Sequence, residues 1–129
     1  MKALVILNPN AGNGELIKNI NLIIKTLNGN NIPTDVILTS KKGDATEYVK
    51  SYGKGRKLVI CAGGDGTLNE IIEGITLAGI DVPIGYIPAG STNDFASSLK
   101  IPKNILKAAE NIMNGEAFYL DSGIFNNNF

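Results

Sequence analysis

Four short apolar runs, rich in valine and isoleucine, alternate along the chain with longer stretches of helical period, and this alternation constrains the fold more than any other feature. Each run is closed by Gly, Pro, Asn or Ser, as is typical of buried strands. The runs are Ala3 to Leu7, Val36 to Thr39, Lys57 to Cys61 and Ile84 to Ile87. Because strands that alternate with helices form parallel sheets with right-handed crossovers, the sequence predicts an α/β fold with helices on both faces of the sheet.

The stretches between the strands carry apolar residues three and four positions apart, which is the spacing of amphipathic helices. These stripes comprise Leu16, Ile20, Ile23, Ile24 and Leu27; Ala45, Tyr48, Val49 and Tyr52; and Leu68, Ile71, Ile72 and Ile75. A further helix is predicted from Ile105 to Met113 and a further strand from Ala117 to Asp121. With 129 residues, of which 43% are hydrophobic, the chain is long enough for one domain and too short for two.

Composition excludes several classes of function. Lys and Arg number 12 against 12 Asp and Glu, so there is no basic excess with which to bind a nucleic acid. The chain contains no His, which excludes Ser-His triads and His-based metal sites. The single cysteine, Cys61, lies in an apolar run and cannot form an intrachain disulfide. No segment approaches the roughly 20 apolar residues of a membrane span, and a cytoplasmic protein is expected.

Three polar, glycine-rich segments follow predicted strands: Asn8 to Gly14, Gly63 to Thr67, and Pro88 to Ala96. Ligands of open α/β sheets bind outside the carboxyl ends of the strands, where these segments would meet. The second segment leads from a strand into a helix, so its backbone N–H groups and the helix dipole can bind an anion. Glycine allows phosphate oxygens to approach the main chain closely. The sequence therefore predicts a phosphate site at this edge of the sheet.

Two details of the second segment refine this prediction. Thr67 and Glu70 have the spacing of a capping box, with Thr67 as N-cap and Glu70 reaching back to it. Asp65 would lie beside the phosphates, where a carboxylate is repulsive unless a cation separates the two. A magnesium ion meets that need, because Mg²⁺ takes only one or two protein carboxylates and keeps several waters.

The commoner nucleotide motifs are absent. Ile17 stands where a dinucleotide fingerprint beginning at Gly12 requires its third glycine, and the Gly-Lys-Ser/Thr of a P-loop occurs nowhere. Neither a Rossmann dehydrogenase nor a P-loop NTPase is supported.

The three segments together resemble the catalytic domain of diacylglycerol kinases and related bacterial lipid kinases. That family carries Asn-Pro-x-x-Gly, Gly-Gly-Asp-Gly-Thr-x-Asn-Glu and Pro-x-Gly-Thr-x-Asn-Asp-Phe-Ala, which stand here as Asn8 to Gly12, Gly63 to Glu70, and Pro88 to Ala96. Order and spacing agree over essentially the whole chain. Gly-Gly-Asp-Gly is shared with NAD kinases and phosphofructokinases, whereas Asn-Asp-Phe-Ala selects the lipid kinases. This chain departs from the third motif at two positions. Ser91 replaces the usual Thr and keeps a hydroxyl there, and Thr92 replaces a frequent Gly.

The resemblance implies the three-layer, Rossmann-like sheet of the lipid kinase and NAD kinase fold, and it implies roles for individual residues. Asp65 would be catalytic, and Asp65, Asp94 and Asp121 would form an acidic network that supports Mg²⁺. The residues that the resemblance assigns to ATP are Asn8, Pro9, Asn10, Ala11, Gly12, Thr39, Gly63, Gly64, Gly66, Thr67, Leu68, Asn69, Glu70 and Ser91.

By the same resemblance, residues 1–129 are the nucleotide-binding N-terminal domain of a kinase that phosphorylates a membrane lipid hydroxyl. A second, β-rich domain, absent from this chain, would carry the general base and most of the lipid site. ATP and a membrane lipid are the expected partners, with peripheral contact at the inner face of the membrane and a homodimer as further expectations. An NAD kinase-like enzyme and a non-catalytic nucleotide-binding module remain alternatives.

Overall fold

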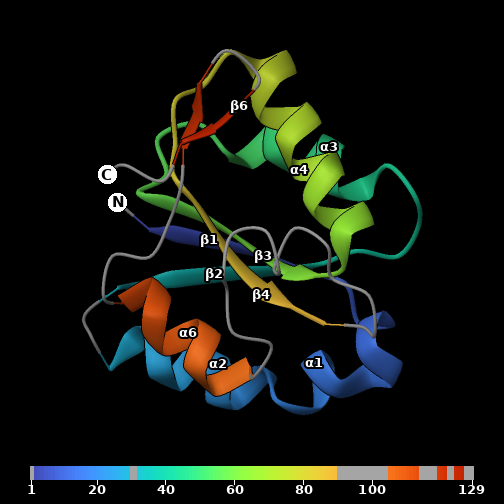
Figure 1. The fold of residues 1–129 in the computed structure, drawn as a ribbon, viewed down its shortest axis with the longest axis vertical. Helices are drawn as coiled ribbons and strands as arrows, with labels where there is room; N and C mark the ends of the chain where they lie inside the picture. Colours follow the sequence, from blue (N-terminus) through green and yellow to red (C-terminus); the bar gives the residue numbers. More distant parts are fainter. Residues whose placement is uncertain (1, 30–31, 90–104, 114–118, 122–123, 127–129) are drawn as a thin grey trace.

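The computed structural model describes residues 2–29, 32–89, 105–113, 119–121 and 124–126, which include a four-stranded parallel sheet between two layers of helices (Figure 1). The strands are β1 (Ala3–Leu7), β2 (Thr34–Leu38), β3 (Leu58–Gly63) and β4 (Ile84–Pro88). They lie in the order β2-β1-β3-β4. The predicted parallel α/β sheet is therefore confirmed, and the carboxyl ends of all four strands point to one edge.

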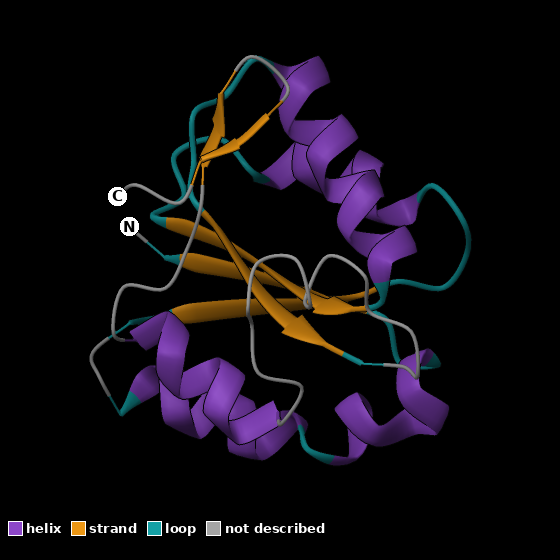
Figure 2. Cartoon of the chain, in the orientation of Figure 1, coloured by secondary structure: helices purple, strands orange, loops and turns teal. Residues whose placement is uncertain are grey.

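Helices cover both faces of the sheet, as the sequence predicts (Figure 2). One face packs against α1 (Glu15–Lys18), α2 (Ile20–Asn28) and α6 (Ile105–Met113). The other face packs against α3 (Asp44–Tyr52) and α4 (Asp65–Ala78).

The alternating side chains of each strand separate the core into two clusters. On β1, Val5 and Leu7 point toward α2 and α6, while Leu4 and Ile6 point toward α3 and α4. All five β1 residues are fully buried, which explains why this strand reads as a continuous apolar run. Burial of each Leu, Val or Ile side chain of this strand contributes about 1.5–3 kcal/mol before entropy is counted.

The apolar stripe from Leu16 to Leu27 is divided between two helices at Asn19. The side-chain amide of Asn19 donates a hydrogen bond to the Glu15 carbonyl oxygen at 2.8 Å. Because this carbonyl is satisfied by a side chain, the helix can bend there and still place Leu16 and Leu27 in the same core cluster.

The last described elements are β5 (Tyr119–Asp121) and β6 (Ile124–Asn126), which pair as an antiparallel two-stranded sheet. The strand predicted from Ala117 to Asp121 thus agrees with β5 at its carboxyl end. Of the predicted site residues, Ser91 and Asp94 lie outside the described residues, as does the side chain of Asp121. Among the helices that the structure describes, none has the length and hydropathy of a membrane span.

Candidate functional site

The loops that follow the strands are joined to one another by hydrogen bonds just beyond the ends of the sheet. The Asn8 amide donates to the Ala62 carbonyl at 2.9 Å, and the Thr39 amide donates to the Leu7 carbonyl at 2.9 Å. The Ala89 amide donates to the Gly63 carbonyl at 3.0 Å. These bonds extend the parallel ladder by one residue, so the loops after β1, β2, β3 and β4 start at the same level of one edge.

The loop after β1 turns sharply toward α1. The Asn8 side-chain oxygen accepts a hydrogen bond from the Asn10 amide at 3.0 Å, which closes an Asx turn. Gly12, Asn13 and Gly14 then adopt left-handed backbone angles, with φ of 60°, 57° and 82°. Glycine adopts such angles without a steric penalty, which accounts for the two glycines of this segment.

The loop after β3 differs from its prediction in one respect: the capping box is wrong. Helix α4 begins at Asp65 with Gly64 as its N-cap, so Thr67 is the third helical residue, and no side chain caps this end. Glu70 reaches another helix instead. Its Oε1 atom accepts hydrogen bonds from the backbone amides of Gly43 at 3.1 Å and Ala45 at 3.2 Å, at the N-terminus of α3.

The glycines of this loop differ in what they permit. A Cβ on Gly63 would lie 2.9 Å from Thr67 Oγ1 and 3.0 Å from Thr67 Cβ, so only glycine allows Thr67 to pack there. A Cβ on Gly66 would meet no atom within 4 Å. Gly64 has a φ of −93°, which any residue adopts. Packing against Thr67 therefore requires glycine at Gly63. At Gly66 the protein itself leaves room for a side chain, so packing does not require glycine there.

The loop after β2 is organised by Asp44. One carboxylate oxygen of Asp44 accepts hydrogen bonds from the Ser40 amide at 2.8 Å, the Ser40 hydroxyl at 2.9 Å and the Lys41 amide at 3.0 Å. These donors, led by the Ser40 amide, hold the pKa of the Asp44 carboxyl below its usual value.

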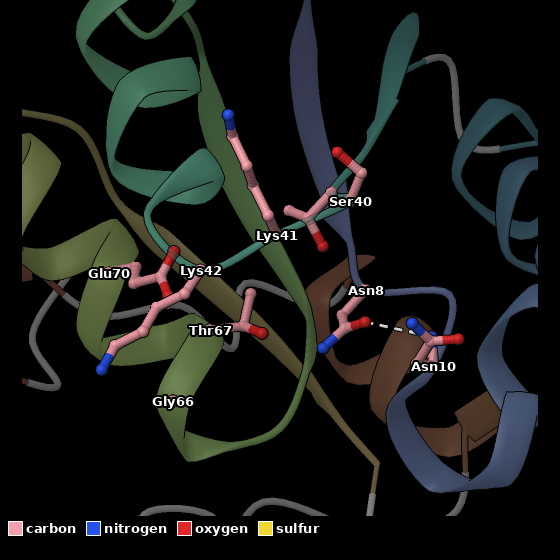
Figure 3. A pocket seen from close by; sticks show the side chains of 9 residues that line it. Asn8, Asn10, Ser40, Lys41, Lys42, Gly66, Thr67 and Glu70 are labelled. Carbon is pink, nitrogen blue, oxygen red and sulfur yellow. Dashed lines mark hydrogen bonds between the residues drawn. The ribbon is translucent and has the colours of Figure 1, made fainter.

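A polar pocket of about 310 Å³ lies where these three loops meet (Figure 3). It is lined by Asn8, Asn10, Thr39, Ser40, Lys41, Lys42, Gly66, Thr67 and Glu70. In Figure 3, Asn8 and Thr67 lie on opposite sides of the pocket, and the ammonium groups of Lys41 and Lys42 extend in different directions from the same loop. The volume falls within the range of small-molecule sites.

The pocket brings together part of the predicted nucleotide set. Asn8, Asn10, Thr39, Gly66, Thr67 and Glu70 line it. The remaining described members of that set are not among the residues that line this pocket: Pro9, Ala11, Gly12, Gly63, Gly64, Leu68 and Asn69. Leu68 is fully buried in the core cluster beneath α4. Three lining residues were missed by the sequence reasoning, namely Ser40, Lys41 and Lys42; their signal was a polar, doubly basic segment directly after a predicted strand.

Asp65 occupies the first position of α4, next to the pocket-lining Gly66. Its Oδ1 atom accepts a hydrogen bond from the Tyr86 hydroxyl at 2.8 Å. Burial, with smaller effects from Cys61 and Asp65, raises the pKa of Tyr86 well above its ordinary value, so the phenol remains a hydrogen-bond donor at neutral pH. Within the described part of the chain, no three Asp, Glu, Cys or His side chains are grouped closely enough to hold a metal ion.

Comparison with known proteins relates this geometry to one family. The family model described as the diacylglycerol kinase catalytic domain matches residues 2–124. The chain is 36% identical over 130 residues to a diacylglycerol kinase of Bacillus subtilis strain 168, covering 99% of this chain and 43% of the relative. It is 37% identical over 131 residues to a diacylglycerol kinase of Staphylococcus epidermidis, covering 99% and 41%.

Solved structures give the same result. A crystal structure of a diacylglycerol kinase from Bacillus anthracis strain Sterne superimposes with a TM-score of 0.80 and 36% identity, covering 88% of this chain and 42% of that one. The chain therefore spans about two-fifths of the length of the relatives that it matches.

Proposed function

Because the chain belongs to the diacylglycerol kinase catalytic domain family, we propose that it forms the ATP site of a lipid kinase. The reaction would move the γ-phosphoryl group of ATP to the hydroxyl of a membrane lipid such as diacylglycerol. The observation that carries this proposal is the pocket where the loops after β1 and β2 meet the N-terminus of α4, with Lys41 and Lys42 on its wall. Phosphoryl transfer depends mainly on positioning and charge stabilisation, and these elements supply both.

The N-terminus of α4 suits the phosphates. The first hydrogen bond within this helix runs from the Leu68 amide to the Gly64 carbonyl at 3.1 Å. The amides of Gly66 and Thr67 precede it and have no carbonyl partner in the helix, so they can donate to an anion. Gly66 adds no side chain that would hinder the approach. The two lysines add positive charge from the opposite loop, which offsets the charge of a polyphosphate.

Magnesium fits this site as a cation held chiefly by phosphate and water, with Asp65 as the carboxylate that we assign to it, since the Glu70 carboxylate accepts from the Gly43 and Ala45 amides. Mg²⁺ commonly takes one or two protein carboxylates, and Tyr86 orients the carboxylate of Asp65 through the bond to Oδ1. Asp94 and Asp121 remain part of the proposed acidic network. When bound, Mg²⁺ would neutralise the charge that develops on the transferred phosphoryl group.

The acceptor half of the reaction needs a base within hydrogen-bond distance of the lipid hydroxyl. We propose that this base and the lipid site belong to a second, β-rich domain beyond residues 1–129. The relatives support this proposal, because this chain matches only about two-fifths of their length.

Two measurements test the proposal. The 129-residue chain is titrated with ATP in a calorimeter, with and without Mg²⁺, and binding that Mg²⁺ strengthens is expected. The complete gene product is then assayed for transfer of radiolabelled phosphate from ATP to extracted membrane lipid. ATP binding without transfer to any lipid would leave a nucleotide-binding module, and transfer to NAD in place of lipid would identify an NAD kinase.

A further inference from the structure

Glu70 joins α4 to the N-terminus of α3. Its carboxylate accepts hydrogen bonds from the Gly43 and Ala45 amides, and its backbone carbonyl accepts one from the Thr46 hydroxyl at 2.7 Å. The two helices also pack closely at Gly74, where an added Cβ would lie 2.8 Å from both the Thr46 carbonyl oxygen and Val49 Cβ. The start of α3 is thereby fixed to α4.

The same segment is held at its other end by Asp44, through the bonds to Ser40 and Lys41 described above. The loop from Ser40 to Gly43 is thus attached at both ends to carboxylates, one from α3 and one from α4. This loop carries Lys41, whose amide is itself one of the donors to Asp44, and Lys42; both side chains are exposed and line the pocket. The conformation of the lysine-bearing backbone therefore depends on Glu70 as well as on Asp44.

We infer that Glu70 is a positioning residue that fixes the loop carrying Lys41 and Lys42, and that it acts on ATP through these lysines without binding ATP itself. A direct contact is unfavourable, because a carboxylate and a polyphosphate repel each other. The charge of Glu70 is instead matched by the positive end of α3 and by two amides that the helix cannot satisfy. Fixing the backbone beneath two long side chains reduces the entropy lost when they bind.

This inference rests on the proposed function, and two conservative variants distinguish it from a direct role of the charge. Glu70→Gln keeps the length of the side chain and an oxygen that accepts from Gly43 and Ala45, but removes the charge. Glu70→Asp keeps the charge but withdraws the carboxylate by one methylene from both amides. Glu73→Gln, on an exposed turn of the same helix, serves as the control.

The experiment combines calorimetric titration with Mg·ATP and amide hydrogen exchange of the unliganded chain. Glu70→Asp is expected to weaken ATP binding about tenfold, the equivalent of one lost hydrogen bond to a charged group, and to speed exchange at Gly43 and Ala45. Glu70→Gln is expected to stay close to the unchanged chain in both measurements, as is Glu73→Gln. The opposite ranking, with Asp better than Gln, would overturn the inference, because it is the ranking of a residue whose charge binds a cation.

A double-mutant cycle tests the route through the lysines. In a Lys41→Met/Lys42→Met background, Glu70→Asp should cause little further loss of ATP affinity, because the groups that it positions are gone. An undiminished tenfold loss in that background would overturn the inference. Absence of ATP binding by the unchanged chain would instead refute the proposed function, so the two failures are distinguishable.

Discussion

Replacement of Gly66 by alanine should stabilise the fold and weaken ATP binding at the same time. Gly66 is the second residue of α4, and an added Cβ would meet no atom within 4 Å. Alanine is favoured over glycine within a helix, so the free energy of unfolding should rise by about 0.5–1 kcal/mol. The same methyl group would stand on the wall of the pocket, beside the amides that are proposed to meet the phosphates.

The expected loss of ATP affinity is at least about tenfold, or about 1.4 kcal/mol, because the phosphates could no longer approach the main chain at van der Waals distance. Urea unfolding gives the stability and calorimetric titration gives the affinity. Thr76→Ala is the matched control: it lies on the exposed side of the same helix, away from the pocket-lining residues, and should raise stability slightly without changing ATP binding.

General damage to the fold would lower both the stability and the ATP affinity. A rise in stability together with a loss of affinity therefore cannot come from such damage. A Gly66→Ala chain that is more stable and binds ATP as tightly as the unchanged chain would refute the placement of the phosphates at the N-terminus of α4. A chain that is less stable would contradict the helical geometry at Gly66.

Three further predictions follow from single contacts. Asp65→Asn keeps an oxygen that accepts from the Tyr86 hydroxyl, so circular dichroism should show an intact fold. Turnover of the complete enzyme should nevertheless fall at least about tenfold. Normal turnover with normal Mg²⁺ dependence would show that Asp65 is only a turn residue. The pKa of Asp44 is lowered in the folded state, so its contribution to stability is present above the unfolded pKa of about 3.9 and is lost as pH falls below that value. Acid should therefore destabilise the unchanged chain more than the Asp44→Asn chain, which urea midpoints measured at several pH values would show. Equal acid sensitivity of the two chains would contradict this prediction. Gly74→Ala should destabilise the chain by about 1–3 kcal/mol in thermal unfolding despite its better helix propensity, since its Cβ would collide with α3; an increase in stability would show that α3 and α4 pack less closely there.

The sequence by itself determined the elements and the edge of the sheet at which the site lies. Strands and helices follow from the period of the apolar residues, which reflects local backbone geometry. Asn8, Thr39 and Thr67 line one pocket because the carboxyl ends of parallel strands meet at one edge, and their contact with a nucleotide stays a prediction. The family motifs added the chemistry, and the match of the family model over residues 2–124 confirms the family.

The tertiary structure decided what each side chain at that edge contacts. Thr67 and Glu70 have the local spacing of a capping box, but the amides that Glu70 binds belong to Gly43 and Ala45, 27 and 25 residues away. Sequence spacing carries no information about such a partner, because it depends on how α3 packs against α4. The same packing, through Glu70 and Asp44, holds Lys41 and Lys42 at the pocket, and only the assembled sheet brings the loop after β2 beside the loop after β3.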